Sequence, residues 1–323
     1  MGNFWKRVSK RIQMTRDSYR SDRQFSIRYA NLRITDELGG RLGFSKASQQ
    51  AHKKRESFIL DYLHTLLEPV FTEFREDTEP GVQEEKAPIW IFWWTGFETA
   101  PPLVKKCVES TCAHGGEHPV HLLDRNNIGD YVTIPDYMQE KLRTKKMGLA
   151  HLADYIRVSL LSQYGGLWLD ATIFCADTVP ESYFAMPIFT CKSLPDHCPY
   201  LSQMRWTTFV FGGWKNNVFY RYLKAAFEQY WSRANTAIDY LFFDYIIELG
   251  CREIPAIREQ LEAVPMNNPH RDDLQAAMNR ADPAENWNEI LQPDTVLYKL
   301  SWRETYAEKT ADGKDSVYAY LLK

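Results

Sequence analysis

Acidic and basic side chains that could bind a charged ligand occur together in residues 148–175, GLAHLADYIRVSLLSQYGGLWLDATIFC. Apolar residues recur at helical spacing over residues 149–164, so this part is predicted as a helix. Asp154 and Arg157 lie three residues apart and would be neighbours on its surface. Asp170 directly follows an apolar run typical of a buried strand, and α/β proteins bind ligands at the carboxyl edge of such strands.

Spacing alone leaves other interpretations of these residues open. An Asp–Arg pair three residues apart is also a common surface ion pair, worth about 0.2 to 0.5 kcal/mol. Asp170 could equally cap the strand end or begin a turn. Gly165 and Gly166 follow the predicted helix, where a left-handed C-cap favours a residue without Cβ. The helix is therefore expected to end there.

The elements around this segment alternate between strand and helix patterns, which predicts an α/β fold with helices on both faces of a mostly parallel sheet. Residues 1–80 instead show helical spacing, and residues 75–88 are charged, aperiodic and carry a Pro-Gly pair, as linkers do. We therefore predict a helical extension and linker over 1–85 and the α/β domain over 86–323. The strand-like stretches are 89–94, 120–123 and 167–174, and the helix-like ones are 102–112 and 149–164.

Composition narrows the class of protein. The 323 residues are 44% hydrophobic and 14% aromatic, which excludes disordered and collagen-like chains. The six cysteines form no Cys-x-x-Cys pair, and the pattern predicts free thiols in a reducing compartment. The net charge of −3 argues against a nucleic-acid partner. No stretch has signal-peptide or membrane-spanning character, which predicts a cytoplasmic protein.

Several motifs taken together resemble glycosyltransferase family 32 and the related bacterial capsular polysaccharide synthesis proteins. The two central motifs are ADYIR (153–157) and YGGLWLDAT (164–172). Similarity begins at IWIFWWTGFETAPPLVKKCVES (89–110) and continues through DY (136–137), AIDYLFFDYII (237–247), VPMNNP (264–269) and YKLSWR (298–303). The resemblance implies a GT-A fold, a nucleotide-diphosphate sugar donor, a divalent metal, and transfer with retention of the anomeric configuration.

The resemblance also implies roles for individual residues. Asp154, Arg157 and Gly166 would belong to the donor site, and Asp170 would be the first acid of a DXD-type motif that holds Mn²⁺ or Mg²⁺. Such an ion would neutralise the charge of the leaving diphosphate. Thr172 stands where the second acid is expected and offers a hydroxyl without charge. Metal binding would then be weaker, use water or recruit another ligand, although the capsular group commonly has this D-A-T form.

Aromatic residues follow the first strand-like stretch. In the resembling proteins this strand end lines the nucleotide pocket, so Trp93, Trp94 and Gly96 are expected to bind the donor, with an indole ring stacked on the base. The alternative is that each tryptophan belongs to the hydrophobic core.

Three charged residues later in the chain are further candidates. Asp244 is expected in the middle of a predicted helix, among bulky apolar residues. An unpaired carboxylate there costs several kcal/mol, so Asp244 is expected to face a polar partner or a cleft near the transferred sugar. Asp239 is expected to be the N-cap of that helix. In the resembling proteins a similar late segment folds over the donor. There Lys299 or Arg303 could bind the leaving diphosphate. The alternative is that each is a solvated surface charge.

The resemblance, together with these residues, implies a metal-dependent retaining hexosyltransferase that acts on a surface glycan or its lipid-linked precursor. A catalytically weak binding module for nucleotide sugars or glycans, motivated by Thr172, and a sugar-phosphate transferase are the alternatives. Residues 1–55 contain 14 Lys and Arg against 4 Asp and Glu, and an amphipathic helix with Phe4 and Trp5 on its apolar face could lie on the inner face of the cell membrane. Packing against the catalytic domain or a partner is the alternative for that helix.

Overall fold

A five-stranded sheet lies at the centre of the fold in the computed structural model, which describes residues 13, 16–41, 45–194, 198, 200–281, 283 and 287–323. The strand order is β2-β1-β3-β6-β5, in which β1 pairs in parallel with β2 and β3, and β6 pairs antiparallel with β3 and β5. Four strands therefore run one way and β6 the other, which confirms the predicted mostly parallel α/β sheet. The bounds are β1 Ile89–Phe92, β2 Val120–Leu123, β3 Gly166–Leu169, β5 Ile188–Thr190 and β6 Val210–Gly213.

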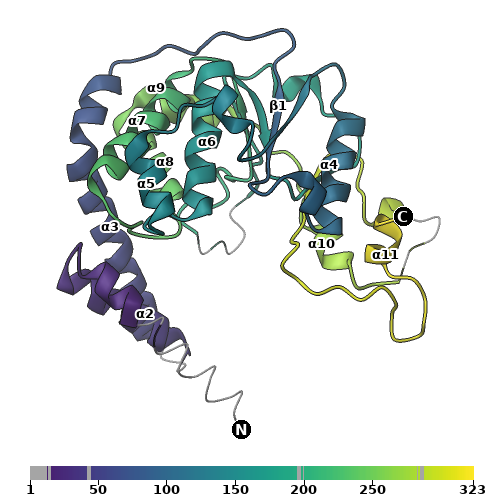
Figure 1. The fold of residues 1–323 in the computed structure, drawn as a ribbon, viewed down its shortest axis with the longest axis horizontal. Helices are drawn as coiled ribbons and strands as arrows, with labels where there is room; N and C mark the ends of the chain where they lie inside the picture. Colours follow the sequence, from purple (N-terminus) through teal and green to yellow (C-terminus); the bar gives the residue numbers. More distant parts are fainter. Residues whose placement is uncertain are drawn as a thin grey trace.

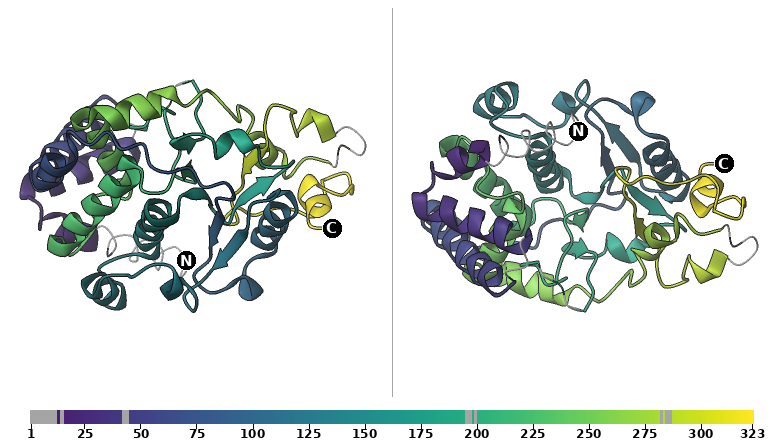
Figure 2. Two further views of the ribbon diagram at one scale, coloured as in Figure 1. Left: turned by 90° about the horizontal axis from the view of Figure 1, so that it is seen from above. Right: turned by 90° about the horizontal axis from the view of Figure 1, so that it is seen from below.

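Helices cover both faces of this sheet. Successive strand residues point to opposite faces, and the apolar side chains on each face pack against helices. Trp90 and Trp168 pack into a core shared with α6 (Leu149–Tyr164), α7 (Val218–Arg233) and α8 (Phe242–Glu253). Ile89 and Leu167, one position earlier on the same strands, pack into a second core with α4 (Pro102–His114). Figure 1 shows α6 and α7 on one side of β1 and α4 on the other, and Figure 2 shows the same layers from above and below.

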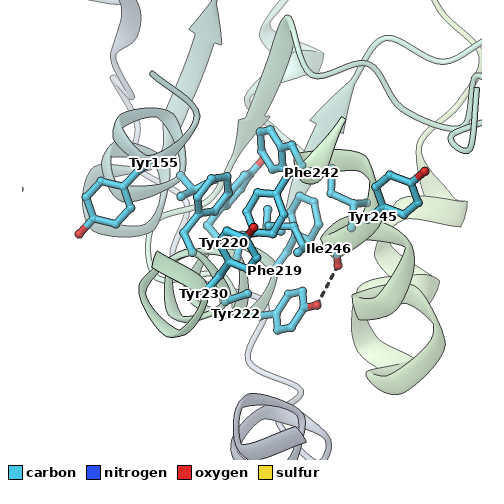
Figure 3. Packing of buried hydrophobic residues seen from close by; sticks show 14 of the residues in the cluster. Tyr155, Phe219, Tyr220, Tyr222, Tyr230, Phe242, Tyr245 and Ile246 are labelled. Atoms are coloured by element: carbon cyan, nitrogen blue, oxygen red, sulfur yellow. Dashed lines mark hydrogen bonds between the residues drawn. The ribbon is translucent and has the colours of Figure 1, made fainter. Parts of the chain in front are cut away.

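The larger core is rich in aromatic rings, as Figure 3 shows. Tyr222 is buried there and its hydroxyl donates to the Ile246 carbonyl at 2.8 Å, so its one polar group is satisfied. Asn217 begins α7 as N-cap, with its side chain accepting from the Phe219 amide. The Tyr222 hydrogen bond connects α7 to α8, which carries one of the predicted site residues.

The N-terminal helical extension is present as a hairpin of α2 (Ile27–Arg41) and α3 (Ser45–Phe74). Ile59 and Leu63 of α3 are fully buried in the same core as α7 and α8, so the hairpin packs against the α/β layers (Figure 1). The hairpin and the α/β layers thus share one core, and the domain boundary at residue 85 stays a prediction.

The predicted membrane-facing helix, with Phe4, Trp5, Val8 and Ile12, lies outside the described residues. Within the described ranges, no helix combines the length and the apolar character that crossing a membrane requires.

The remaining helices and strands surround the sheet and its C-terminal edge. They are α5 Asp136–Arg143, α9 Pro255–Ala263, α10 Asp273–Ala277, α11 Val317–Leu321, β4 Ile173–Cys175 and β7 Leu297–Lys299. Short 3₁₀ turns occupy Phe97–Thr99, Ile128–Asp130, Glu181–Tyr183 and Trp287–Glu289. Strands β4 and β7 pair antiparallel in a separate two-stranded sheet.

The prediction of one continuous strand over residues 167–174 is wrong. The stretch 167–174 is divided between β3 and β4, which belong to different sheets. The cause is a turn in which the Ile173 amide donates to the Asp170 carbonyl at 2.8 Å. Asp170 and Thr172 therefore lie at a corner between two sheets, where their side chains are not confined to the alternation of a continuous strand.

The end of α6 is as predicted, because the helix ends at Tyr164 and the next two residues, Gly165 and Gly166, both have positive φ (68° and 94°). A Cβ on Gly166 would lie 2.1 Å from the Pro88 carbonyl oxygen. The glycine pair therefore lets the chain turn from helix into the central strand β3 against its neighbour.

Candidate functional site

A cavity of about 380 Å³ opens at the corner between β3 and β4, at the carboxyl end of the parallel strands. This volume is within the usual range for small-molecule sites. The cavity brings together eight residues singled out from the sequence: Trp93, Asp154, Arg157, Asp170, Thr172, Asp244, Lys299 and Arg303. Trp93 directly follows β1, Asp154 and Arg157 lie on α6, and Asp170 and Thr172 form the corner. Asp244 lies on α8, Lys299 ends β7, and Arg303 follows β7 by four residues.

Asp170 is the centre of a charged network. Its Oδ1 accepts from Arg157 Nη2 and from Trp168 Nε1, each at 3.0 Å. Its Oδ2 accepts from Lys299 Nζ at 3.0 Å, and the same ammonium donates to Thr172 Oγ1 at 2.7 Å. Each oxygen of the carboxylate is therefore bound by a different cation.

The two cations also control the charge of Asp170. Burial by itself raises the pKa of this carboxyl, but the Lys299 ammonium and the Arg157 guanidinium outweigh it and hold the pKa below the ordinary 3.8. Asp170 is consequently ionised at neutral pH, and the corner carries a fixed arrangement of one negative and two positive groups.

Arg157 is held rigidly in the wall of the cavity, with only 5% of the residue exposed. Its Nη1 donates to Asp154 Oδ1 at 3.0 Å, so the helical pair predicted from spacing is formed. The guanidinium also lies 4.9 Å from the Trp168 ring centroid and 5.5 Å from that of Phe243. Its Nε is buried without a hydrogen-bond partner among the described residues. The pair is thus part of a buried network and is not a solvated surface bridge.

Asp244 lies in the first turn of α8, and the expectation of a mid-helix position is wrong because the helix begins only at Phe242. Its Oδ1 accepts from Trp206 Nε1 at 2.8 Å, and the side chain lines the cavity. Burial raises the pKa of Asp244 to about 6, with the Asp154 carboxylate adding to the rise and the Trp206 hydrogen bond opposing it.

Asp239 does not act as the N-cap of α8. The N-cap residue is Leu241, which has no side-chain cap, while Asp239 Oδ1 accepts from the Leu241 amide at 2.9 Å. The Asp239 carboxylate also pairs with Arg55 of α3 at 3.5 Å. This acid therefore orders the turn before the helix and ties it to the N-terminal hairpin.

Aromatic rings line the cavity near its charged corner. Trp93 and Trp302 pack edge to face with ring centroids 5.7 Å apart, and Trp302 is 41% exposed. The Arg303 guanidinium lies 5.6 Å from the Trp302 ring centroid. Sequence reasoning missed Trp302 and the exposed Tyr240, which also lines the cavity. An aromatic residue beside a predicted cation, as in Trp302-Arg303, was the available signal.

Three predicted donor-binding residues are not brought to this cavity. Trp94 lines a different cavity with Arg125 and residues of α5. Gly96 has φ of 82° before a 3₁₀ turn, and a Cβ there would lie 3.1 Å from Asp124 Oδ2. Gly166 is enclosed by the Pro88 backbone, as described above. At each glycine the missing side chain is explained by the local backbone.

The side chains at the corner do not fit a divalent metal. The oxygens predicted as ligands, Asp170 Oδ2 and Thr172 Oγ1, both accept from Lys299 Nζ. Mg²⁺ requires near-octahedral oxygen ligands at about 2.0 to 2.1 Å. Over the residues that the structure describes, no group of three or more His, Cys, Asp or Glu side chains is arranged to hold a metal ion. The chemistry derived for this corner therefore uses the side chains alone.

Comparison with known proteins gives one family match and partial matches to two further proteins. Residues 41–321 match the sequence model of the family described as capsular polysaccharide synthesis protein. The O-glycosyltransferase braB of Annulohypoxylon truncatum is 29% identical over 126 residues, covering 33% of this chain and 30% of that protein. The O-glycosyltransferase PaGT of Phomopsis amygdali is 32% identical over 91 residues, covering 25% of this chain and 22% of that protein. The chain thus spans less than a third of the length of these two relatives.

Proposed function

The chain belongs to the capsular polysaccharide synthesis protein family, and we propose that it is a retaining glycosyltransferase. It would move a hexose from a nucleotide-diphosphate sugar to a hydroxyl of a capsular or exopolysaccharide glycan or of its lipid-linked precursor. The observation that carries this proposal is the cavity corner, where Asp170 is bound by Arg157 and Lys299 at 3.0 Å each. The two O-glycosyltransferase relatives support the same class of reaction.

The charges of the cavity suit the two ends of such a donor. Lys299 and Arg303 supply positive charge for the diphosphate, while Asp154 and Asp244 supply carboxylates for the sugar hydroxyls. Trp93 and Trp302 offer ring faces and edges against which a base or sugar can pack. Because Arg157 is held by two rings and two carboxylates, the corner is ordered before the donor binds, which lowers the entropic cost of orienting it.

In the proposed reaction, the bond between the anomeric carbon of the sugar and the phosphate oxygen breaks, and its electron pair stays on the diphosphate. The acceptor oxygen bonds to the anomeric carbon on the same face, and its proton passes to an oxygen of the leaving phosphate. Lys299 and Arg303 stabilise the charge that grows on the diphosphate. Asp244, ionised above a pKa of about 6, stabilises the positive charge that develops at the anomeric carbon.

The acceptor and the site of action form a further part of the proposal. A glycan or lipid-linked oligosaccharide would approach the open side of the cavity, at the inner face of the cell membrane. The basic N-terminal segment would supply peripheral contact with anionic lipids. A vesicle-binding assay of the full chain, compared with a variant in which the lysines and arginines of residues 1–12 are replaced by glutamine, tests this part separately from the chemistry.

Donor turnover is the direct test. Purified protein is mixed with a panel of UDP- and GDP-sugars and candidate glycan acceptors, with Mn²⁺ and separately with EDTA, and released nucleoside diphosphate is measured. Asp170→Asn is expected to lower release by about 100-fold, because it removes the charge that orients two cations. Asp177→Asn, at an exposed carboxylate after β4, is the matched control and should keep wild-type release.

The outcomes separate the candidate functions. Release from one donor that is lost in Asp170→Asn supports the transferase. Binding without release in the presence of acceptors favours the binding module that the missing second acid at Thr172 suggested. A product that retains phosphate identifies a sugar-phosphate transferase. If no donor is bound and none is turned over, the proposal is contradicted.

A further inference from the structure

The Lys299 ammonium lies where a metal ion would have to bind. Its Nζ is 3.0 Å from Asp170 Oδ2 and 2.7 Å from Thr172 Oγ1, which belong to the first and third residues of the D-A-T motif. A Mg²⁺ ion bound by both oxygens at about 2.0 to 2.1 Å would meet the ammonium group. Lys299 and a metal therefore compete for one place at the corner.

Backbone pairing keeps Lys299 at this place. In the β4–β7 ladder, Lys299 is opposite Ile173, the residue after Thr172. The Leu300 amide donates to the Thr172 carbonyl at 2.9 Å, and the Lys299 amide donates to the Arg271 carbonyl at 2.7 Å. The lysine side chain consequently begins beside the D-A-T motif, and the register of two strands fixes that origin.

The other oxygen of Asp170 is also engaged. Oδ1 accepts from Arg157 and Trp168, so the carboxylate has no oxygen left without a donor. Arg157 is shared between Asp170 and Asp154, so the Lys299 ammonium is the cation that balances Asp170. Two acids and a divalent ion sum to zero charge, and so do Asp170, the uncharged Thr172 and Lys299. The lysine therefore balances the motif without a metal ion.

The ammonium group still has capacity for a ligand. It carries three N–H donors, and the described residues Asp170 and Thr172 take two of them. The side chain is 27% exposed and lines the cavity, so the third donor is available to an anion there. Arg303 lines the same cavity four residues later and adds a second, exposed cation.

We propose that Lys299 takes the part of the divalent cation at this site, so that the protein binds a nucleoside diphosphate through Lys299 without metal. This inference rests on the proposed function, because it concerns the diphosphate of the same donor. It replaces the Mn²⁺ or Mg²⁺ that the family resemblance implies with a cation that belongs to the chain. The predicted metal requirement and this proposal lead to opposite results when metal is removed.

Calorimetric titration of the full chain with UDP, GDP, CDP and dTDP provides the test. At least one nucleoside diphosphate is expected to bind with the same affinity in EDTA as in Mn²⁺. Lys299→Met should weaken that binding by about 10- to 100-fold, the worth of a charge-assisted hydrogen bond. The control is Lys224→Met, which removes a lysine that pairs with Glu228 at 2.6 Å outside the cavity.

The comparison of EDTA with Mn²⁺ in the wild type keeps the test valid if Lys299→Met disturbs the fold. A double variant then tests the exchange of the two cations. Lys299→Met combined with Thr172→Asp removes the cation and supplies the second acid, so its nucleotide binding should become dependent on Mn²⁺. Electron paramagnetic resonance measures the free and the bound Mn²⁺ directly. The double variant should bind Mn²⁺ more tightly than the wild type does. Equal Mn²⁺ affinity of the two proteins would contradict the competition between lysine and metal.

Two results would overturn the inference, and they are distinguishable. Nucleotide binding by the wild type that requires Mn²⁺ and survives Lys299→Met would refute the role of the lysine while leaving the glycosyltransferase intact. No binding of any of the four nucleotides in either buffer would refute the proposed function together with the inference.

Discussion

Replacing Asp244 by asparagine should make the folded protein more stable at neutral pH. Burial raises the pKa of this carboxyl from an ordinary 3.8 to about 6, so folding favours its protonated form. Each pH unit between these two pKa values corresponds to about 1.4 kcal/mol of folding free energy. The difference between 3.8 and about 6 therefore corresponds to about 3 kcal/mol.

The sign follows from the direction of the pKa change. Below pH 3.8 the carboxyl is protonated in both the folded and the unfolded chain, and its burial has no charge-related cost. As the pH rises from 3.8 to about 6, the folded state loses stability because the unfolded chain releases this proton more readily. The amide introduced by Asp244→Asn cannot ionise, and its oxygen can still accept from Trp206 Nε1.

Urea unfolding of wild type and Asp244→Asn at pH values from 4 to 8 measures the effect. The variant's free energy of unfolding minus that of the wild type should increase as the pH rises from about 4 to about 6. Above that pH the difference should stay at about 3 kcal/mol. Asp177→Asn, at an exposed carboxylate, controls for removing an acid. A difference between Asp244→Asn and wild type that does not change with pH would refute the reasoning. Wild-type turnover in the same variant would contradict the proposed role of Asp244 at the transferred sugar.

Two further variants test the corner and the aromatic lining. Gly166→Ala should destabilise the fold by about 2 to 5 kcal/mol in urea unfolding, because φ is 94° and the new Cβ would lie 2.1 Å from the Pro88 oxygen. Gly129→Ala, where a Cβ meets nothing within 4 Å, is its control, and equal stability of the two variants would contradict the explanation. Trp302→Ala should weaken nucleoside diphosphate binding in calorimetry by about 10-fold through lost stacking. Tyr320→Ala removes an exposed aromatic outside the cavity, and an effect as large as that of Trp302→Ala would refute a specific role.

Four residues of the cavity, Asp154, Arg157, Asp170 and Thr172, could be predicted because they lie in one continuous segment. Helical periodicity predicted residues 149–164 as a helix, and the glycine pair predicted its end, because both signals act through neighbouring residues. The Asp154–Arg157 pair follows from the same geometry, since residues three apart on a helix are neighbours. The acid at the end of the apolar run was also identified from local pattern, and it lies at the corner of the cavity.

The tertiary structure decided which partners these residues have. Lys299 reaches Asp170 across 129 positions of sequence, and Trp206 reaches Asp244 across 38, because strand register and helix packing bring distant segments together. No local pattern contains such a register. The sequence by itself therefore determined the helix, its glycine end and the acid that follows. Only the folded chain decided that this acid faces a lysine, because the ammonium and the carboxylate meet through the pairing of β4 with β7.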